Sequence, residues 1–90
     1  MITTVVGIVS SSCHECVELK ERLVAFFEER DIELNFVEVS YDDDPIGAIE
    51  AADEFGLNEI PSFLIGGVVF ARIFGNNQVE DAVRKIKEDA

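Results

Sequence analysis

Basic residues are scarce in this sequence, which has 7 Lys and Arg against 19 Asp and Glu and a formal net charge of −12. A chain so acidic repels phosphate backbones and anionic lipid headgroups instead of releasing their counterions. It also lacks an apolar run of the roughly 18 to 20 residues that a membrane-spanning helix needs. The first residues, Met1-Ile2-Thr3-Thr4, lack the basic region of a secretory signal. We therefore expect a cytoplasmic protein that binds neither nucleic acid nor membranes.

Cysteine is scarce as well, and its placement is informative. The two cysteines both lie in Cys13-His14-Glu15-Cys16, so they cannot form a framework of several disulfides and are more simply one local unit. With 48% hydrophobic and 29% charged residues, the chain is too apolar for disorder and too mixed for a collagen-like or low-complexity sequence. We expect residues 1–90 to form one domain and the protein to be a monomer.

The hydrophobic pattern predicts seven elements in the order βαβαββα. A right-handed βαβ crossover would make the first two strands parallel, and a two-residue turn at Gly66-Gly67 would make the last two antiparallel. The predicted fold class is therefore α/β, with a four-stranded mixed sheet flanked by three helices. The expected strands are 2–9, 33–39, 62–65 and 68–74, and the expected helices are 13–30, 45–55 and, after a cap at Asn77, 78–88.

Polar residues precede each predicted helix at positions that suit a cap. Ser12 has the capping-box spacing to Glu15, and Asp44 stands directly before a proline at the first helical position. The third helix has the same spacing between Asn77 and Glu80, and Gly56 suits the end of the second. The residues expected to face the core are Ile46, Ile49 and Ala52 in the second helix and Val79, Val83 and Ile86 in the third.

The two cysteines occupy different positions on the first predicted helix. Cys13 is expected at its first residue, where the positive end of the helix dipole should lower the thiol pKa below the roughly 8.5 of a free cysteine. Cys13 is therefore the candidate nucleophile. Cys16 lies on the core-facing stripe and is the candidate resolving cysteine, because it can attack a mixed disulfide formed at Cys13 and release the reduced substrate.

The residues between the cysteines have plain alternatives to a redox role. His14 would stabilise the neighbouring thiolate when protonated, or else is simply solvated. Glu15 is expected to be a capping residue, and its charge would oppose a thiolate at Cys13. A single Cys-x-x-Cys pair is also half of a tetrahedral zinc site, with His14 as a third ligand. Because no second pair exists and these neighbours do not converge easily on one ion, we expect no metal and no cofactor.

Three features together resemble the thioredoxin superfamily, over nearly all 90 residues. They are the Cys13-x-x-Cys16 motif between a strand and a helix, Ile60-Pro61 before a hairpin, and the βαβαββα order. The resemblance implies a cis proline at Pro61 beside the cysteine pair, with Ile60 and Pro61 forming one wall of a substrate groove. Gly75 would border that groove, near the family's glycine after the last strand. The alternative for Pro61 is a trans proline that merely starts a strand.

The resemblance implies a dithiol-disulfide oxidoreductase that reduces protein disulfides with electrons from a reductase of the thioredoxin-reductase type. A glutathione-linked glutaredoxin is the alternative, although no basic residue follows Cys13 before Lys20 to receive a glutathione carboxylate. A non-catalytic binding or metal-binding module is a third. The chain departs from thioredoxin in lacking a tryptophan before Cys13, Gly-Pro between the cysteines and the family's buried aspartate, near which Gly7 stands.

Overall fold

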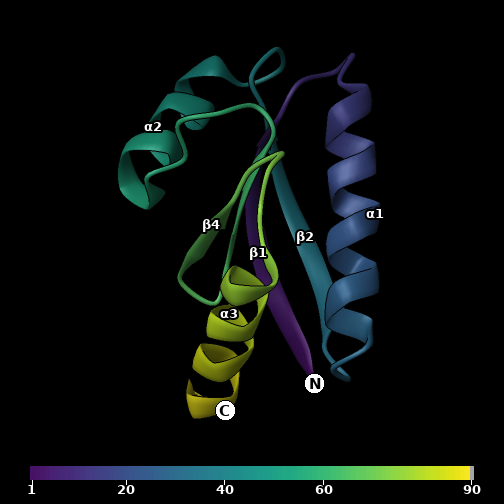
Figure 1. Cartoon of the computed structure of the whole chain (residues 1–90). Helices are drawn as coiled ribbons and strands as arrows, with labels where there is room; N and C mark the ends of the chain where they lie inside the picture. Colours follow the sequence, from purple (N-terminus) through teal and green to yellow (C-terminus); the bar gives the residue numbers. More distant parts are fainter. Residues whose placement is uncertain (90) are drawn as a thin grey trace.

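The computed structural model describes residues 1–89 and contains the seven elements in the predicted order (Figure 1). The start of β1 and the end of α3 lie at one end of the molecule, and the β1–α1 and β2–α2 connections lie at the other (Figure 1). The strands are β1 (Ile2–Val9), β2 (Glu33–Ser40), β3 (Ser62–Ile65) and β4 (Val68–Phe70). The helices are α1 (His14–Glu28), α2 (Pro45–Phe55) and α3 (Asn76–Asp89).

The four strands form one mixed sheet in the order β2-β1-β3-β4. β1 pairs parallel with β2 and antiparallel with β3, and β3 pairs antiparallel with β4. The turn between the last two strands consists of Gly66 and Gly67, at φ of 56° and 79°. Left-handed backbone at both central residues matches the twist of a two-residue hairpin, which glycine permits without a steric penalty. The predicted mixed sheet is confirmed.

The helices cover the two faces of the sheet unequally. Side chains of α1 and α3 share one core with β1, β3 and β4, while α2 packs on the opposite face in a smaller core (Figure 1). The buried residues of α3 include the predicted Val79, Val83 and Ile86. The larger core is rich in phenylalanine, and Phe27, Phe63 and Phe70 are fully buried.

The start of α1 differs from the prediction by one residue. Cys13 is the N-cap, with extended backbone, and its sulfur accepts a hydrogen bond from the Cys16 amide. The expected Ser12–Glu15 capping box is therefore wrong, because the sulfur of Cys13 serves as the capping acceptor. The helix ends at Glu28, two residues before the predicted Arg30.

The second helix is bounded as predicted but presents a different face to the sheet. Asp44 accepts a hydrogen bond from the Gly47 amide at 3.0 Å, and Gly56 ends the helix at φ 70°. The buried side chains are Ala48 and Ala51, whereas Ile46 and Ile49 are 71% and 53% exposed. Ala52 is partly buried against the smaller core, as predicted. The prediction is wrong for Ile46 and Ile49, because apolar residues occupy almost every side of this helix and their spacing does not single out one face.

Strand β4 is shorter than predicted, and α3 starts earlier. β4 ends at Phe70 instead of Phe74, and Phe74 packs edge-to-face against Phe26 and Phe70. The first turn of α3 begins with Gly75, whose carbonyl accepts hydrogen bonds from the amides of Gln78 and Val79. The Gln78 side chain in turn accepts from the Gly75 amide at 3.0 Å. This reciprocal pair replaces the expected cap at Asn77.

Gly7 in the central strand lies under the ring of Phe63. A Cβ on Gly7 would stand 2.1 Å from Phe63 Cδ1, far inside van der Waals contact. We predict that Gly7→Ala lowers the free energy of unfolding by about 1–3 kcal/mol, because overpacking forces the buried ring out of place. Urea denaturation followed by circular dichroism measures this change.

The exposed Thr4 on the same strand provides the matched control. Thr4→Ala should change the stability by less than about 1 kcal/mol, since only β propensity is altered. Combining Gly7→Ala with Phe63→Leu should cost less than the sum of the two single changes, because the smaller side chain relieves the overlap. If the two destabilisations simply added, Gly7 and Phe63 would not be in contact.

Candidate functional site

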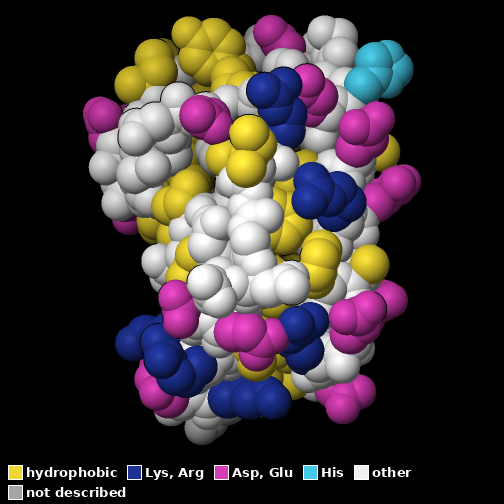
Figure 2. Space-filling model, in the orientation of Figure 1, with side chains coloured by type: hydrophobic (Ala, Val, Ile, Leu, Met, Phe, Trp, Pro, Cys, Tyr) yellow, Lys and Arg dark blue, Asp and Glu magenta, His cyan; other side chains and the backbone are white. Residues whose placement is uncertain are grey.

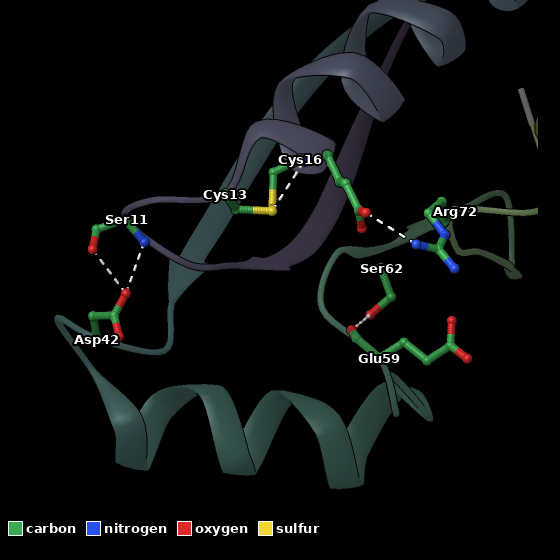
Figure 3. The surroundings of a disulfide bond; sticks show 8 residues. Ser11, Cys13, Cys16, Asp42, Glu59, Ser62 and Arg72 are labelled. Atoms are coloured by element: carbon green, nitrogen blue, oxygen red, sulfur yellow. Dashed lines mark hydrogen bonds and ion pairs between the residues drawn. A yellow bond between two sulfur atoms is a disulfide. The ribbon is translucent and has the colours of Figure 1, made fainter.

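The cysteine pair lies where the central strand passes into the first helix. Cys13 and Cys16 form a disulfide with a Cα–Cα distance of 5.3 Å (Figure 3). Ser10 to Ser12 connect β1 to α1, so the pair is held at the carboxyl end of β1. The predicted proximity of the two sulfurs is confirmed.

The two sulfurs differ in access and in electrostatic surroundings. Cys13 is half-buried, whereas Cys16 is only 6% exposed and packs in the larger core. The Cys16 amide donates a hydrogen bond to Cys13 Sγ at 3.0 Å. Because this amide belongs to the open first turn of α1, it and the helix dipole favour negative charge on Cys13 once the disulfide is reduced. The arrangement suits an accessible nucleophile and a protected resolving thiol.

His14 and Glu15 lie on the rim of the site. Both are exposed, and His14 is the cyan side chain near the top of Figure 2. Glu15 accepts a hydrogen bond from Arg72 Nη1 at 3.0 Å, so its partner is across the site and not at the start of its own helix (Figure 3). Such an exposed ion pair contributes at most about 1 kcal/mol. The carboxylate is therefore easily released from Arg72 by a competing group.

Arg72 is a site residue that sequence reasoning missed. It lies in the irregular segment after β4, 57 residues away from Glu15 in the chain. Arg22 on α1 donates a hydrogen bond to the Arg72 carbonyl at 3.3 Å and stacks over the Phe74 ring. These contacts hold the segment against α1 and bring the Arg72 guanidinium to Glu15, which lies between the two cysteines in sequence. Arg72 reaches the site only through tertiary packing, so no local spacing in the sequence could have identified it.

Ile60 and Pro61 lie directly before β3, at the end of the sheet that carries the cysteine pair. Their peptide bond is cis, as the resemblance implied. Ser62 pairs with Ile8 near the end of β1, which brings the two preceding residues to the end of the sheet that carries the cysteines. Pro61 is fully buried, whereas Ile60 is 45% exposed. Ser62 Oγ donates to the Glu59 carbonyl at 2.6 Å and fixes the approach (Figure 3).

Gly75 is exposed at the start of α3. A Cβ there would meet nothing within 4 Å, so no contact within the described chain requires glycine at this position. Its role in bordering a groove stays a prediction. A depression of about 360 Å³ does lie between the α2–β3 connection and the segment after β4, lined by residues that include Glu59, Ser62, Ala71 and Arg72.

Asp42 ties the β2–α2 connection to the segment before Cys13. Its carboxylate accepts hydrogen bonds from both the amide and the hydroxyl of Ser11, each at 2.8 Å (Figure 3). The hydrogen bond from the Ser11 amide has the largest effect, and together with the bond from the hydroxyl it lowers the pKa of Asp42 below its ordinary 3.8. Asp42 therefore holds the serine segment, Ser10 to Ser12, on the side of the site away from Arg72 (Figure 3).

Within residues 1–89, no group of three or more His, Cys, Asp or Glu side chains is arranged to hold a metal ion. In the same part of the chain, no helix is long and apolar enough to cross a membrane.

Fold and site together define an α/β protein with a mixed four-stranded sheet and a Cys-x-x-Cys pair at the start of its first helix, which is compatible with a thioredoxin-like fold. The chain matches no family model, and no curated protein or solved structure matches it significantly.

The Ser11–Asp42 contact predicts a particular titration. Because the folded pKa of Asp42 lies below 3.8, its contribution to stability is fully present above pH 3.8 and is lost as the pH falls through the lowered value. NMR titration of the Asp42 carboxyl should give a midpoint below 3.8. Ser11→Ala should raise the midpoint only in part, since the amide remains as a donor.

Ser12→Ala removes a hydroxyl from the neighbouring residue and should leave the Asp42 midpoint unchanged. A midpoint at or above 3.8 in the parent protein would show that Asp42 does not hold the serine segment in solution.

Proposed function

We propose that this protein is a thiol-disulfide oxidoreductase with a thioredoxin-like fold that reduces disulfides in other proteins. The observation that carries the proposal is the unequal cysteine pair. Cys13 is half-buried at the positive end of α1, and Cys16 is buried behind it within disulfide distance. The position of Ile60 and Pro61 at the same end of the sheet supports the assignment.

The first step is attack by the reduced Cys13 thiolate on a substrate disulfide. A bond forms between Cys13 Sγ and one substrate sulfur, and the other substrate sulfur leaves as a thiolate that takes up a proton. The amide of Cys16 and the dipole of α1 stabilise the attacking anion. Ile60, with its exposed side chain, provides one wall for the bound substrate, and Gly75 is proposed to border the same groove.

The second step resolves the mixed disulfide. Cys16 loses its proton and attacks Cys13 Sγ, which breaks the mixed disulfide and releases the second substrate thiol. Two electrons have then passed from the cysteine pair to the substrate, and the product is the Cys13–Cys16 disulfide seen here. Return to the dithiol needs two electrons, for which we propose a donor of the thioredoxin-reductase type. A reducing cytoplasm is the compartment in which this direction is favoured.

Arg72 favours a second candidate, a glutathione-linked reaction. The sequence offers no cation near Cys13, but the fold brings the Arg72 guanidinium to within 3.0 Å of Glu15, between the two cysteines in sequence. If Glu15 releases it, Arg72 can receive a carboxylate of glutathione. The Glu15 charge and the net charge of −12 oppose an anionic tripeptide, so reduction of protein disulfides remains the primary proposal.

Serine substitutions separate the two cysteine roles. Cys13→Ser should reduce the turnover of insulin disulfides to the uncatalysed background, because the nucleophile is lost. Cys16→Ser should also stop turnover but accumulate a mixed disulfide at Cys13, which mass spectrometry of the acid-quenched protein detects. Undiminished activity of the Cys13 variant would overturn the proposal.

The electron donor is tested in the same assay. Turnover supported by a thioredoxin reductase with NADPH, and not by glutathione with glutathione reductase, is the expected result. Saturable turnover with glutathione alone, reduced by Arg72→Gln, would move the assignment to the glutathione-linked reaction.

A further inference from the structure

Four apolar side chains beside the site are exposed without an evident role in folding. Tyr41, Ile46, Ile49 and Ile60 are 46%, 71%, 53% and 45% exposed, and we call them the α2 patch. Tyr41, Ile49 and Ile60 line one depression of about 140 Å³, and Ile46 stands one helical turn before Ile49. In Figure 2, apolar side chains gather at the same end of the molecule as His14.

The inner face of α2 is made of small residues. Ala48 and Ala51 are buried against the sheet, and the two isoleucines point away from it. Single exposed apolar residues are ordinary on a protein surface. A group of adjoining large apolar residues that α2 does not use for packing indicates an interaction surface.

Two residues of the α2 patch directly precede, in the chain, residues that border the cysteine site. Ile60 belongs to the patch and directly precedes the buried Pro61. Tyr41 directly precedes Asp42, whose carboxylate holds Ser11, two residues before Cys13. A protein segment bound at Cys13 can therefore extend over the patch without leaving the surface.

The charge around the α2 patch has one sign. Residues 41–60 contain seven Asp and Glu residues and no Lys, Arg or His. Asp42, Asp43, Asp44, Glu50, Asp53 and Glu59 are exposed around the apolar side chains. Such a surface attracts a basic partner, repels an acidic one and disfavours a second copy of this chain.

We propose that the α2 patch docks the disulfide-bearing segment of a basic partner protein. The apolar side chains of that segment contact Tyr41, Ile46, Ile49 and Ile60, and its Lys and Arg residues pair with the surrounding carboxylates. The substrate class is thus a disulfide flanked by apolar and basic residues. This inference rests on the proposed function, because it places the substrate of that same site.

Binding is measured apart from redox chemistry by using the Cys13→Ser/Cys16→Ser protein. The probe is a fluorescein-labelled synthetic peptide with leucine and lysine on either side of a central serine, and fluorescence anisotropy gives its affinity. Adding Ile46→Ser and Ile49→Ser should weaken binding at least about tenfold, or about 1.4 kcal/mol. Asp43→Asn/Asp53→Asn should weaken it as well, and salt should weaken the parent more than this variant.

Val17 supplies the matched control variant. It is 56% exposed on α1, on the opposite face of the sheet, so Val17→Ser makes a similar change away from the patch. It should leave the peptide affinity unchanged. Since the substituted isoleucines are exposed, thermal unfolding of the patch variant should match the parent.

Equal affinity of the parent and the patch variant would overturn the proposal, as would a preference for a peptide with glutamate in place of lysine. Parent protein that sediments as a dimer, with the patch variant monomeric, would assign the surface to a second copy of the chain instead. Reduction of a small aromatic disulfide by the cysteine-containing protein tests the oxidoreductase separately. Its absence with patch-dependent binding intact would overturn the proposed function while the docking surface stands.

Discussion

Pairing of β1 with a strand on each side fixes the positions of the other elements and of the cysteine pair. β2 lies parallel along all eight residues of β1, and β3 lies antiparallel beside its second half. Val5 and Val9 face the larger core while Ile8 faces the smaller one, so the position of β1 is fixed from both faces. The parallel pairing requires a crossover connection, and the helix in that connection is capped by Cys13. The position of the two sulfurs therefore follows from the burial of β1 in the sheet.

The same arrangement explains how distant residues reach one site. Antiparallel pairing of Ser62 with Ile8 brings the cis peptide to the end of the sheet that carries the cysteines. The segment after β4 is held by Arg22 and Phe26 on α1, which brings in Arg72. The two sides of the site differ in charge, because Arg72 lies on the β4 side and the charged residues within 41–60 on the α2 side are all carboxylates. Chemistry at Cys13 and recognition on α2 are adjoining but separate properties.

Local patterns in the sequence predict the order of elements, the mixed sheet, the Gly66-Gly67 turn and the proximity of the cysteines, since each depends on short-range periodicity or turn chemistry. The inner face of α2 could not be predicted, because apolar residues nearly surround that helix and only packing selects the alanines. The cap at Cys13 depends on whether Ser12 or Cys13 supplies the side-chain acceptor for an amide of the first helical turn, and the structure has the Cys16 amide donating to Cys13 Sγ. The Glu15–Arg72 and Ser11–Asp42 contacts join residues 57 and 31 positions apart, and no local pattern encodes them.

The proposed chemistry depends on Cys13 being the reactive thiol and Cys16 the protected one. The most direct measurement is site-resolved alkylation of the reduced protein with iodoacetamide over a range of pH, with each cysteine quantified by mass spectrometry after proteolysis. Cys13 should be modified first, and at a pH below that at which a free cysteine reacts, because it is accessible and lies at the positive end of α1. Equal rates for the two cysteines, or faster modification of Cys16, would contradict it.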